Sequence, residues 1–349
     1  MYKSKWQKRK NNTPYLIAEI GVNHETNIDN AKLMIEQIRH SEWDCVKFQT
    51  YTADSIAQIN SPAYWDTTKE VSSTQHELFS KFDKFSLENY IELADFAKSI
   101  DLDFCTTLFN EFLINDYDNL LPFYKIASAD ITNYLLIENI LEKGKDVLIS
   151  TGAATIEEII NVVNFVQQNK KDSSNIILMH CVLNYPTSYQ NADLTKICHL
   201  QEQFPNIEIG YSDHVPPDDG NLCLITAYLL GAKIIEKHFT YDKSLKGNDH
   251  YHAYDYKDAK SFVNKIKQIE ILLGDKDKDV TKNQSMSRLN ARRSLVARQN
   301  IVKGEELSIN NITALRPYNG ISPELWPQIK GKISKNNIKR NSLIKIGDF

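Results

Sequence analysis

The 349-residue sequence predicts an α/β protein, a (β/α)8 TIM barrel followed by a small, mostly β domain. Three observations predict this class. Eight short apolar runs, rich in β-branched residues, alternate with helix-like segments over about 270 residues, the length and rhythm of such a barrel. Polar residues gather where those runs end. No glycine-rich dinucleotide-binding turn follows any run, which argues against a doubly wound open sheet.

The predicted strands span residues 15–21, 45–50, 103–109, 123–128, 147–151, 176–181, 207–211 and 233–237. Apolar residues recur at helical spacing between them, with Asn27 placed to cap the first helix and Thr155–Glu158 forming a capping box for a later one. Further helices are expected at residues 86–100, 132–143, 194–204, 222–231 and 257–273. Residues 52–85 form a long irregular excursion, and loops of that length are usually functional or covering.

The pattern divides the chain into a frayed basic tail (1–12), the barrel (13–280), a polar linker (281–292) and the small domain (293–349). No apolar run approaches the roughly 20 residues that span a bilayer, and the basic start lacks the apolar stretch of a secretory signal. The five cysteines are scattered, as in reduced intracellular proteins. We therefore expect a cytoplasmic protein with no membrane partner.

Charge is distributed unevenly along the chain. Residues 281–349 hold 13 Lys or Arg and 4 Asp or Glu, a net charge of +9, although the whole chain carries −4. A basic piece on an acidic body could bind nucleic acid, or it could dock on an acidic surface of its own chain or of a partner subunit. Because no aromatic residues interleave the basic ones, we favour docking and expect no nucleic acid.

Two histidines end neighbouring predicted strands. Strand, helix and strand run from Ile207 to His238, and a right-handed crossover would bring His214 and His238 side by side. Two neutral imidazoles there could hold Mn, Fe, Co or Zn, with the carboxylates of Asp213 and Glu236 close enough to orient ligands. The alternative is that each histidine is simply hydrogen-bonded at a strand end. His250 and His252 could add ligands, although we rather expect one of them on the pocket lip.

Lys47 and Lys125 are cations inside strand-like segments. Alternation along the strand places Lys47 on the face toward the barrel axis. Two ammonium groups among hydroxyls suit a small anion that carries a phosphate and a carboxylate, and the hydroxyls are those of Thr107, Ser128, Ser150 and Ser212. Each lysine could instead pair with an acid, or one could form a Schiff base. On the first loop, Glu25 could move a proton or remain a solvated loop residue.

Several motifs, in order along nearly the whole chain, resemble the sialic acid (N-acetylneuraminate, nonulosonate) synthase family. They are Ala18-Glu-Ile-Gly-Val-Asn-His-Glu25, Val46-Lys-Phe-Gln49, Tyr124-Lys-Ile-Ala-Ser128, Ser150-Thr-Gly152, Gly210-Tyr-Ser-Asp-His214 and Glu236-Lys-His-Phe-Thr240. The last 55 or so residues, with Ile301-Val-Lys-Gly-Glu305 and Leu315-Arg-Pro-Tyr-Asn-Gly320, resemble the antifreeze-like (SAF) domain of that family.

The resemblance implies a cytoplasmic transferase of carbohydrate biosynthesis. It would join phosphoenolpyruvate to the open-chain aldehyde of an N-acetylated hexosamine, with cleavage of the C–O bond to phosphate. His214 and His238 would bind a divalent metal, most often Mn²⁺. Phosphoenolpyruvate would contact Lys47, Thr107, Lys125, Ser128, Ser150 and Ser212. The sugar would face Glu25, Tyr185, Glu236, Asp249 and Arg316, with Glu25 handling the proton. Arg316 would come from the partner in a domain-swapped homodimer.

The sequence departs from the family pattern mainly on the sugar side, at Thr26, Asp130, Asn184 and the segment Gly247-Asn-Asp-His-Tyr-His252. The acceptor is therefore N-acetylmannosamine or a relative, or alternatively a diamino-dideoxy precursor of legionaminic or pseudaminic acid. Two other classes stay open. A metal-dependent TIM-barrel hydrolase would want an HxH motif where this chain has Asn23-His24, and a non-catalytic carbohydrate-binding protein would not need Lys47 or the two histidines.

Overall fold

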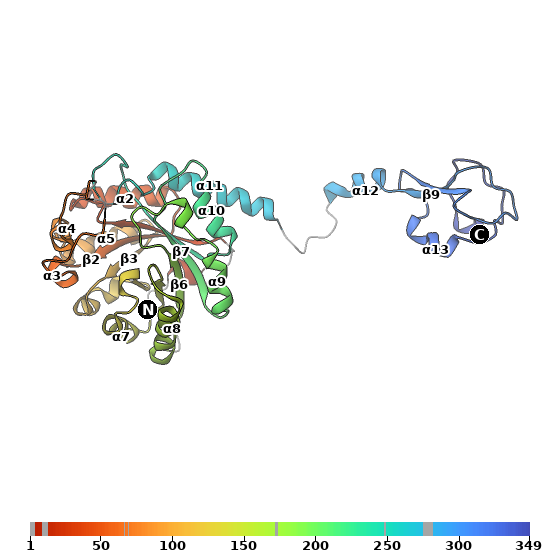
Figure 1. Ribbon diagram of the computed structural model, residues 1–349. Coiled ribbons are helices and arrows are strands. Elements are labelled where there is room, and N and C mark those ends of the chain that lie inside the picture. The colour runs from red at the N-terminus through yellow and green to blue at the C-terminus, as the bar shows by residue number, and fades with distance from the viewer. Residues whose placement is uncertain are drawn as a thin grey trace. The chain divides into compact units, whose positions relative to one another are not determined.

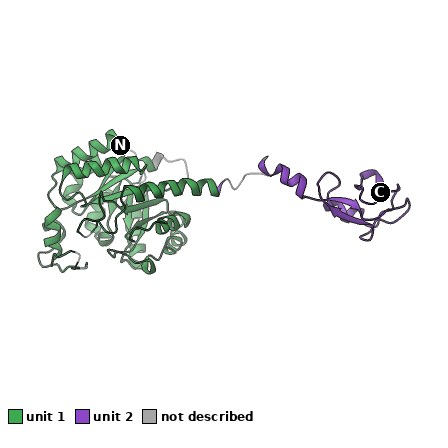
Figure 2. Ribbon diagram, turned by 90° about the horizontal axis from the view of Figure 1, so that it is seen from above, with its two compact units in different colours: residues 1–272 green, residues 273–349 purple. Residues whose placement is uncertain are grey.

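The computed structural model describes residues 4–8, 13–65, 67–68, 70–171, 174–247, 249–274 and 282–349. The chain forms two compact units, residues 1–272 and 273–349 (Figure 2).

The first unit is a barrel of eight parallel strands surrounded by helices (Figure 1). The strands are β1 (Tyr15–Gly21), β2 (Cys45–Thr50), β3 (Asp103–Leu108), β4 (Tyr124–Ile126), β5 (Val147–Ser150), β6 (Ile176–Cys181), β7 (Glu208–Asp213) and β8 (Ile234–His238). Their order is β3-β2-β1-β8-β7-β6-β5-β4, and β3 also contacts β4, where the Cys105 thiol lies 3.8 Å from the Phe123 carbonyl oxygen. The sheet is thus nearly closed, which confirms the predicted barrel.

The helices that follow the strands form where the sequence predicts them. They are α2 (Ile28–His40), α5 (Leu87–Ser99), α6 (Ile114–Tyr117), α7 (Tyr134–Leu141), α8 (Ile156–Asn169), α9 (Lys196–Gln203), α10 (Leu222–Leu229) and α11 (Tyr256–Leu273). Asn27 caps α2 by accepting from two backbone N–H groups, and the Thr155–Glu158 box begins α8. Each long helix buries one apolar stripe against the strands, so the helices cover the outer face of the barrel.

The excursion between β2 and α5 contains two short helices, α3 (Ala53–Ile56) and α4 (Gln75–Phe82). It is anchored by Tyr51, whose ring packs edge-on against Phe79 with centroids 5.2 Å apart. Tyr64, Leu78 and Phe79 from this segment line the pocket described below. The excursion is therefore part of the wall of that pocket.

The amino-terminal tail is ordered where the structure describes it, so the expectation of a frayed tail is wrong for residues 4–8. Helix α1 (Lys5–Lys8) begins after the buried Ser4. The Lys5 N–H donates to Asp103 at 2.6 Å, and the Lys5 ammonium lies 2.8 Å from Asp101. These contacts hold the helix at the amino end of β3. Residues 1–3 and 9–12 of the tail lie outside the described residues.

The second unit has its own small core. Strands β9 (Ser294–Ala297) and β10 (Ile312–Leu315) pair antiparallel, with α12 (Ser285–Ala291) before them and α13 (Trp326–Ile329) after. Leu295, Leu307 and Ile344 are among the buried residues between them. Helix α12 occupies the segment predicted as linker. Within the described residues of both units, no helix is long and apolar enough to cross a membrane.

Candidate active site

A pocket of about 420 Å³ lies among the carboxyl-terminal ends of the barrel strands. The barrel residues to which the family resemblance assigns a role all line it: Glu25, Lys47, Thr107, Lys125, Ser128, Ser150, Tyr185, Ser212, His214, Glu236, His238 and Asp249. The strands converge there because all eight run parallel, so residues at their carboxyl ends meet at one mouth of the barrel.

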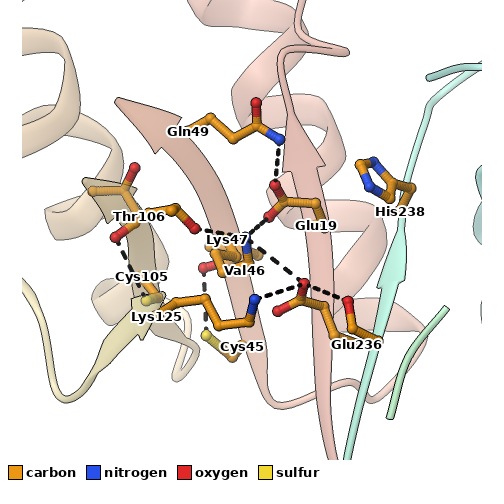
Figure 3. Close-up of polar contacts among 12 residues, drawn as sticks. Glu19, Cys45, Val46, Lys47, Gln49, Cys105, Thr106, Lys125, Glu236 and His238 are labelled. Carbon is orange, nitrogen blue, oxygen red and sulfur yellow. Dashed lines mark hydrogen bonds and ion pairs between the residues drawn. The ribbon is translucent and has the colours of Figure 1, made fainter. Parts of the chain in front are cut away.

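The deep part of the pocket holds two ammonium groups and two carboxylates (Figure 3). The Lys47 ammonium lies 2.5 Å from Glu19 Oε2 and 3.9 Å from Glu236 Oε1. Lys125 lies 3.7 Å from the same oxygen of Glu236. Both lysines thus have acidic neighbours, as the alternative interpretation required, and both also line the pocket. Before an anion enters, the two positive charges are balanced when both carboxylates are ionised.

Hydroxyl groups complete this cluster. Lys47 donates to Thr107 Oγ1 at 3.0 Å, and Lys125 donates to Ser150 Oγ at 2.7 Å. Ser212 donates to Glu236 at 3.0 Å. Of the four predicted anion-binding hydroxyls, Thr107 and Ser150 therefore bond the two ammonium groups directly. Ser128 lines the same pocket, where its Oγ accepts from the Gly152 N–H at 3.0 Å.

The pKa values of the two carboxylates shift in opposite directions. It raises the pKa of Glu19 to about 7, against the lowering influence of Lys47. Burial would also raise the pKa of Glu236, but Lys125 and Lys47 together hold it below its ordinary value. The pKa of Lys47 is raised because Glu19 and Glu236 outweigh its burial. Glu19 is thus the acid in this cluster that titrates near neutral pH.

The two strand-end histidines face each other across the pocket. Their ring centroids are 5.3 Å apart. His214 Nδ1 lies 2.8 Å from the Val182 carbonyl oxygen, so this nitrogen donates and Nε2 is left with a lone pair. Among the described residues, His238 Nδ1 has no hydrogen-bond partner. Burial, followed by the neighbouring rings of His252 and His214, lowers the pKa of His238 well below its usual value, which keeps it neutral. The pKa of His214 is raised, because the Cys181 thiol and the Val182 carbonyl outweigh its burial, so a cation would compete with a proton for its Nε2. Two imidazoles that face each other in this way fit a divalent metal.

The segment after β8 brings two more histidines to this mouth of the barrel. His250 Nε2 lies 2.8 Å from Glu25, and its Nδ1 lies 2.8 Å from Thr240 Oγ1. His252 is fully buried, with its ring centroid 4.9 Å from that of His238. Asp249 belongs to the same segment, and burial raises its pKa to about 6. His250 lines the pocket although it is buried, and His252 lies beside the metal-fitting pair. Neither ring is exposed, so the lip position expected for one of them is not observed.

Residues 34–278 match the NeuB family, and residues 292–349 match the SAF domain. The chain belongs to the NeuB family.

Characterised relatives extend the match to almost the whole chain. An N,N'-diacetyllegionaminic acid synthase of Campylobacter jejuni is 34% identical, covering 95% of this chain and 98% of that protein. A pseudaminic acid synthase of Helicobacter pylori is 33% identical over 96% and 98%. The crystal structure of an N-acetylneuraminic acid synthetase from Leptospira borgpetersenii superposes with a TM-score of 0.66 at 27% identity, covering 79% of this chain and 90% of that one.

Three polar residues that the sequence places near the rim of this NeuB barrel point elsewhere. His24 stacks on Phe85, with centroids 4.2 Å apart, and burial lowers its pKa to about 3. Asp213 binds the Lys237 ammonium at 2.6 Å on the helix side of the strands, so the expectation that it orients ligands is wrong. Asn184 is exposed and lines a separate pocket. Strand alternation explains Asp213, because its neighbour His214 takes the inward direction.

One residue of the NeuB site, Glu19, was not among those predicted from the sequence. Glu19 stands in an otherwise apolar strand, and a lone carboxylate in a buried run was the signal that could have identified it. Its Oε1 accepts from Gln49 at 2.9 Å, and the other oxygen meets Lys47. His252 was named with His250 as a possible metal ligand, but loop spacing alone does not fix where either side chain points.

Arg316 belongs to the SAF unit of this NeuB protein. It directly follows β10, is exposed, and borders a shallow hollow with Met286 and Asn290. Its predicted contact with the sugar remains a prediction.

Proposed function

We propose that this NeuB family protein is a nonulosonic acid synthase. It condenses phosphoenolpyruvate with the open-chain aldehyde of an N-acetylated hexosamine, N-acetylmannosamine or a relative, to give a nine-carbon 2-keto acid and phosphate. The observation that carries the proposal is the juxtaposition, in one pocket, of the Lys47–Lys125 hydroxyl cluster with the His214–His238 pair. The named activities of the relatives support it.

Phosphoenolpyruvate is held by its two anionic groups. Lys47 and Lys125 supply charge-assisted hydrogen bonds, and the surrounding hydroxyls bind the remaining oxygens, contributed by Thr107, Ser128, Ser150 and Ser212. This fixes C3 of the enol toward the histidine side of the pocket. The C3–aldehyde bond forms, water adds at C2, and the C2–O bond to phosphate breaks.

His214 and His238 would hold a divalent cation, Mn²⁺ in our proposal. They fit one because both rings are buried, face each other and have nitrogen lone pairs available. Once bound, the ion supplies a Lewis acid for the aldehyde oxygen. Glu25, hydrogen-bonded to His250 at the pocket mouth, delivers or accepts the proton at that oxygen. Tyr185, Glu236 and Asp249 line the space left for the sugar.

We also propose that the protein is a cytoplasmic, domain-swapped homodimer in which Arg316 of the partner subunit faces the sugar. Support comes from the five free cysteines, as in reducing compartments, and from the opposite net charges of the SAF segment and the remainder of the chain.

A second candidate acceptor is a diacetamido-dideoxy hexose, the precursor of legionaminic or pseudaminic acid. The names of relatives at 33–34% identity favour it. The hydrolase alternative has no support in the geometry, because His24 stacks on Phe85 and does not line the pocket.

The deciding experiment measures phosphate release from phosphoenolpyruvate. Purified protein is stripped with chelator, then given Mn²⁺ and a panel of N-acetylated and diacetamido hexoses. We expect release that requires both the metal and one aldose, with a 2-keto acid as the product. Folded, metal-loaded protein that releases no phosphate with any aldose would refute the proposal and favour a non-catalytic sugar-binding role.

A further inference from the structure

The segment Gly247–His252 places a third imidazole against the histidine pair. The His252 ring lies 4.9 Å from that of His238 and 6.1 Å from that of His214, between centroids, and its side chain is fully buried. His238, Asp249 and His252 each offer a donor atom, and these atoms all lie within 4.8 Å of one another. Imidazoles from β7, β8 and the following segment therefore surround one small space.

These separations match those of rings that share an ion. With metal–nitrogen bonds near 2.1 Å, imidazole centroids on one tetrahedral or octahedral ion are about 4.7–5.4 Å apart. The His214–His238 and His238–His252 separations, 5.3 and 4.9 Å, lie within that range. The third, 6.1 Å, needs a shift of less than about 1 Å, which a side-chain rotation supplies.

We propose that His252 is a third protein ligand of the divalent metal, so that three histidines hold the ion. The inference rests on the proposed function, because it takes His214 and His238 as the first two ligands. Asp249 lies 3.7 Å from His238 Nδ1 and 4.0 Å from His252 Nε2, so its carboxylate lies next to the two rings and also lines the pocket. Tyr185 and Tyr251 enclose the His252 ring, with centroids 5.7 and 5.2 Å away.

A third imidazole changes which metal ions the site binds most tightly. It replaces a water in the coordination sphere, so the ion is held more tightly and fewer positions stay open for substrate. Nitrogen donors also suit Zn²⁺, Co²⁺ and Fe²⁺ better than Mn²⁺, which prefers oxygen. Removing His252 should therefore weaken binding of the nitrogen-preferring ions more than binding of Mn²⁺.

The test is calorimetric titration of Mn²⁺ and Co²⁺ into metal-free, full-length protein. His252→Ala should raise the Kd for Mn²⁺ at least about tenfold and that for Co²⁺ by more, since losses of 10–100-fold follow even from changes behind the ligands. The matched control is His180→Asn, which removes a buried histidine that bonds the Ala192 carbonyl at 2.9 Å and does not line the main pocket. Affinities of His252→Ala within twofold of wild type would overturn the inference.

A second measurement needs no variant. Pulsed EPR of Mn²⁺-loaded wild type counts the imidazole nitrogens coupled to the ion, and three would support the inference whereas two would refute it. Different results would exclude the metal itself and His252 as its ligand. Folded wild type and His180→Asn that bind no Mn²⁺ would remove the metal from the proposed function as well. A wild type that binds the ion through two imidazoles would remove only His252.

Discussion

Glu19 sets the charge of the deep end of the pocket near neutral pH. Lys47 and Lys125 face Glu19 and Glu236, so the cluster is neutral when both acids are ionised. The pKa of Glu19, raised by burial to about 7, makes it the acid that gains a proton first as pH falls. Below that pKa the cluster carries a net positive charge, and above it the charge is cancelled.

An incoming trianion should therefore draw a proton onto Glu19. We expect phosphoenolpyruvate binding near neutral pH to be accompanied by proton uptake, and the Kd to rise as pH increases above about 7. Glu19→Gln keeps the shape and removes the titration, so uptake should fall and the pH dependence should flatten. Calorimetry in two buffers of different ionisation enthalpy measures the protons directly.

The comparison with Glu19→Gln removes the contribution of phosphoenolpyruvate itself, because its own ionisation is the same for both proteins. Glu92→Gln, on the exposed face of α5, serves as the surface control. Equal proton uptake by wild type and Glu19→Gln would show that another group titrates on binding.

For single residues, the sequence could predict those side chains whose direction follows from strand alternation. Lys47 and His238 lie on strands, and His214 directly follows one, so their inward direction was predictable. His252 and the Glu25–His250 contact depend on the path of two loops, which no local pattern determines. The pKa of Glu19 depends on burial and on Lys47 and Glu236 from other strands, which the pattern of its own strand does not show.

Strands β7 and β8 each place a charged residue outward directly before an inward histidine. Asp213 and Lys237 are opposite each other in the parallel ladder and join as a buried ion pair at 2.6 Å. Asp213 also accepts from the Tyr211 hydroxyl and the Val215 N–H. The pair links the ends of the two strands directly next to His214 and His238.

Breaking the Asp213–Lys237 ion pair should lower the stability of the fold. Lys237→Met leaves the Asp213 carboxylate buried without its cation, and we expect a loss of about 3–5 kcal/mol in the free energy of unfolding. Urea unfolding of the metal-free protein measures it. Lys233→Met, an exposed lysine just before β8, is the matched control and should stay within about 0.5 kcal/mol of wild type. Equal stabilities of the two variants would mean that the pair contributes nothing to the fold.

Elements were predictable in proportion to their length and periodicity. The strands and the capped helices α2 and α8 carry strong local signals. Helices α1, α3 and α4 are short and polar, and they form through tertiary contacts such as the Lys5–Asp103 and Tyr51–Phe79 contacts. The excursion could therefore be recognised as covering, but its helices could not.

The whole chain combines an acidic barrel with a basic SAF unit. The sequence could separate the two because the barrel pattern ends and the charge reverses, with +9 on residues 281–349 against −4 for the whole. The sequence pattern does not determine on which barrel the SAF unit docks. A short connection is compatible with docking on its own barrel or on that of a second copy.

Complementation between two inactive variants tests the swapped arrangement. Arg316→Ala and Lys47→Ala should each abolish turnover, one by removing the sugar contact and the other by removing the phosphoenolpyruvate contact. In a swapped dimer, mixed subunits rebuild one complete site from the barrel of one protomer and the Arg316 of the other. Refolding an equal mixture should then restore about a quarter of the wild-type phosphate release.

The control mixes Lys47→Ala with Lys125→Ala, two lesions on the barrel that no exchange of SAF units can repair. Activity in the first mixture and none in the second would place Arg316 across the subunit boundary. If neither mixture releases phosphate and Arg316→Ala is inactive by itself, the arginine contributes to the site of its own barrel. Full activity of the Arg316→Ala variant would mean that Arg316 is not needed for turnover. The basic unit would then act only in docking.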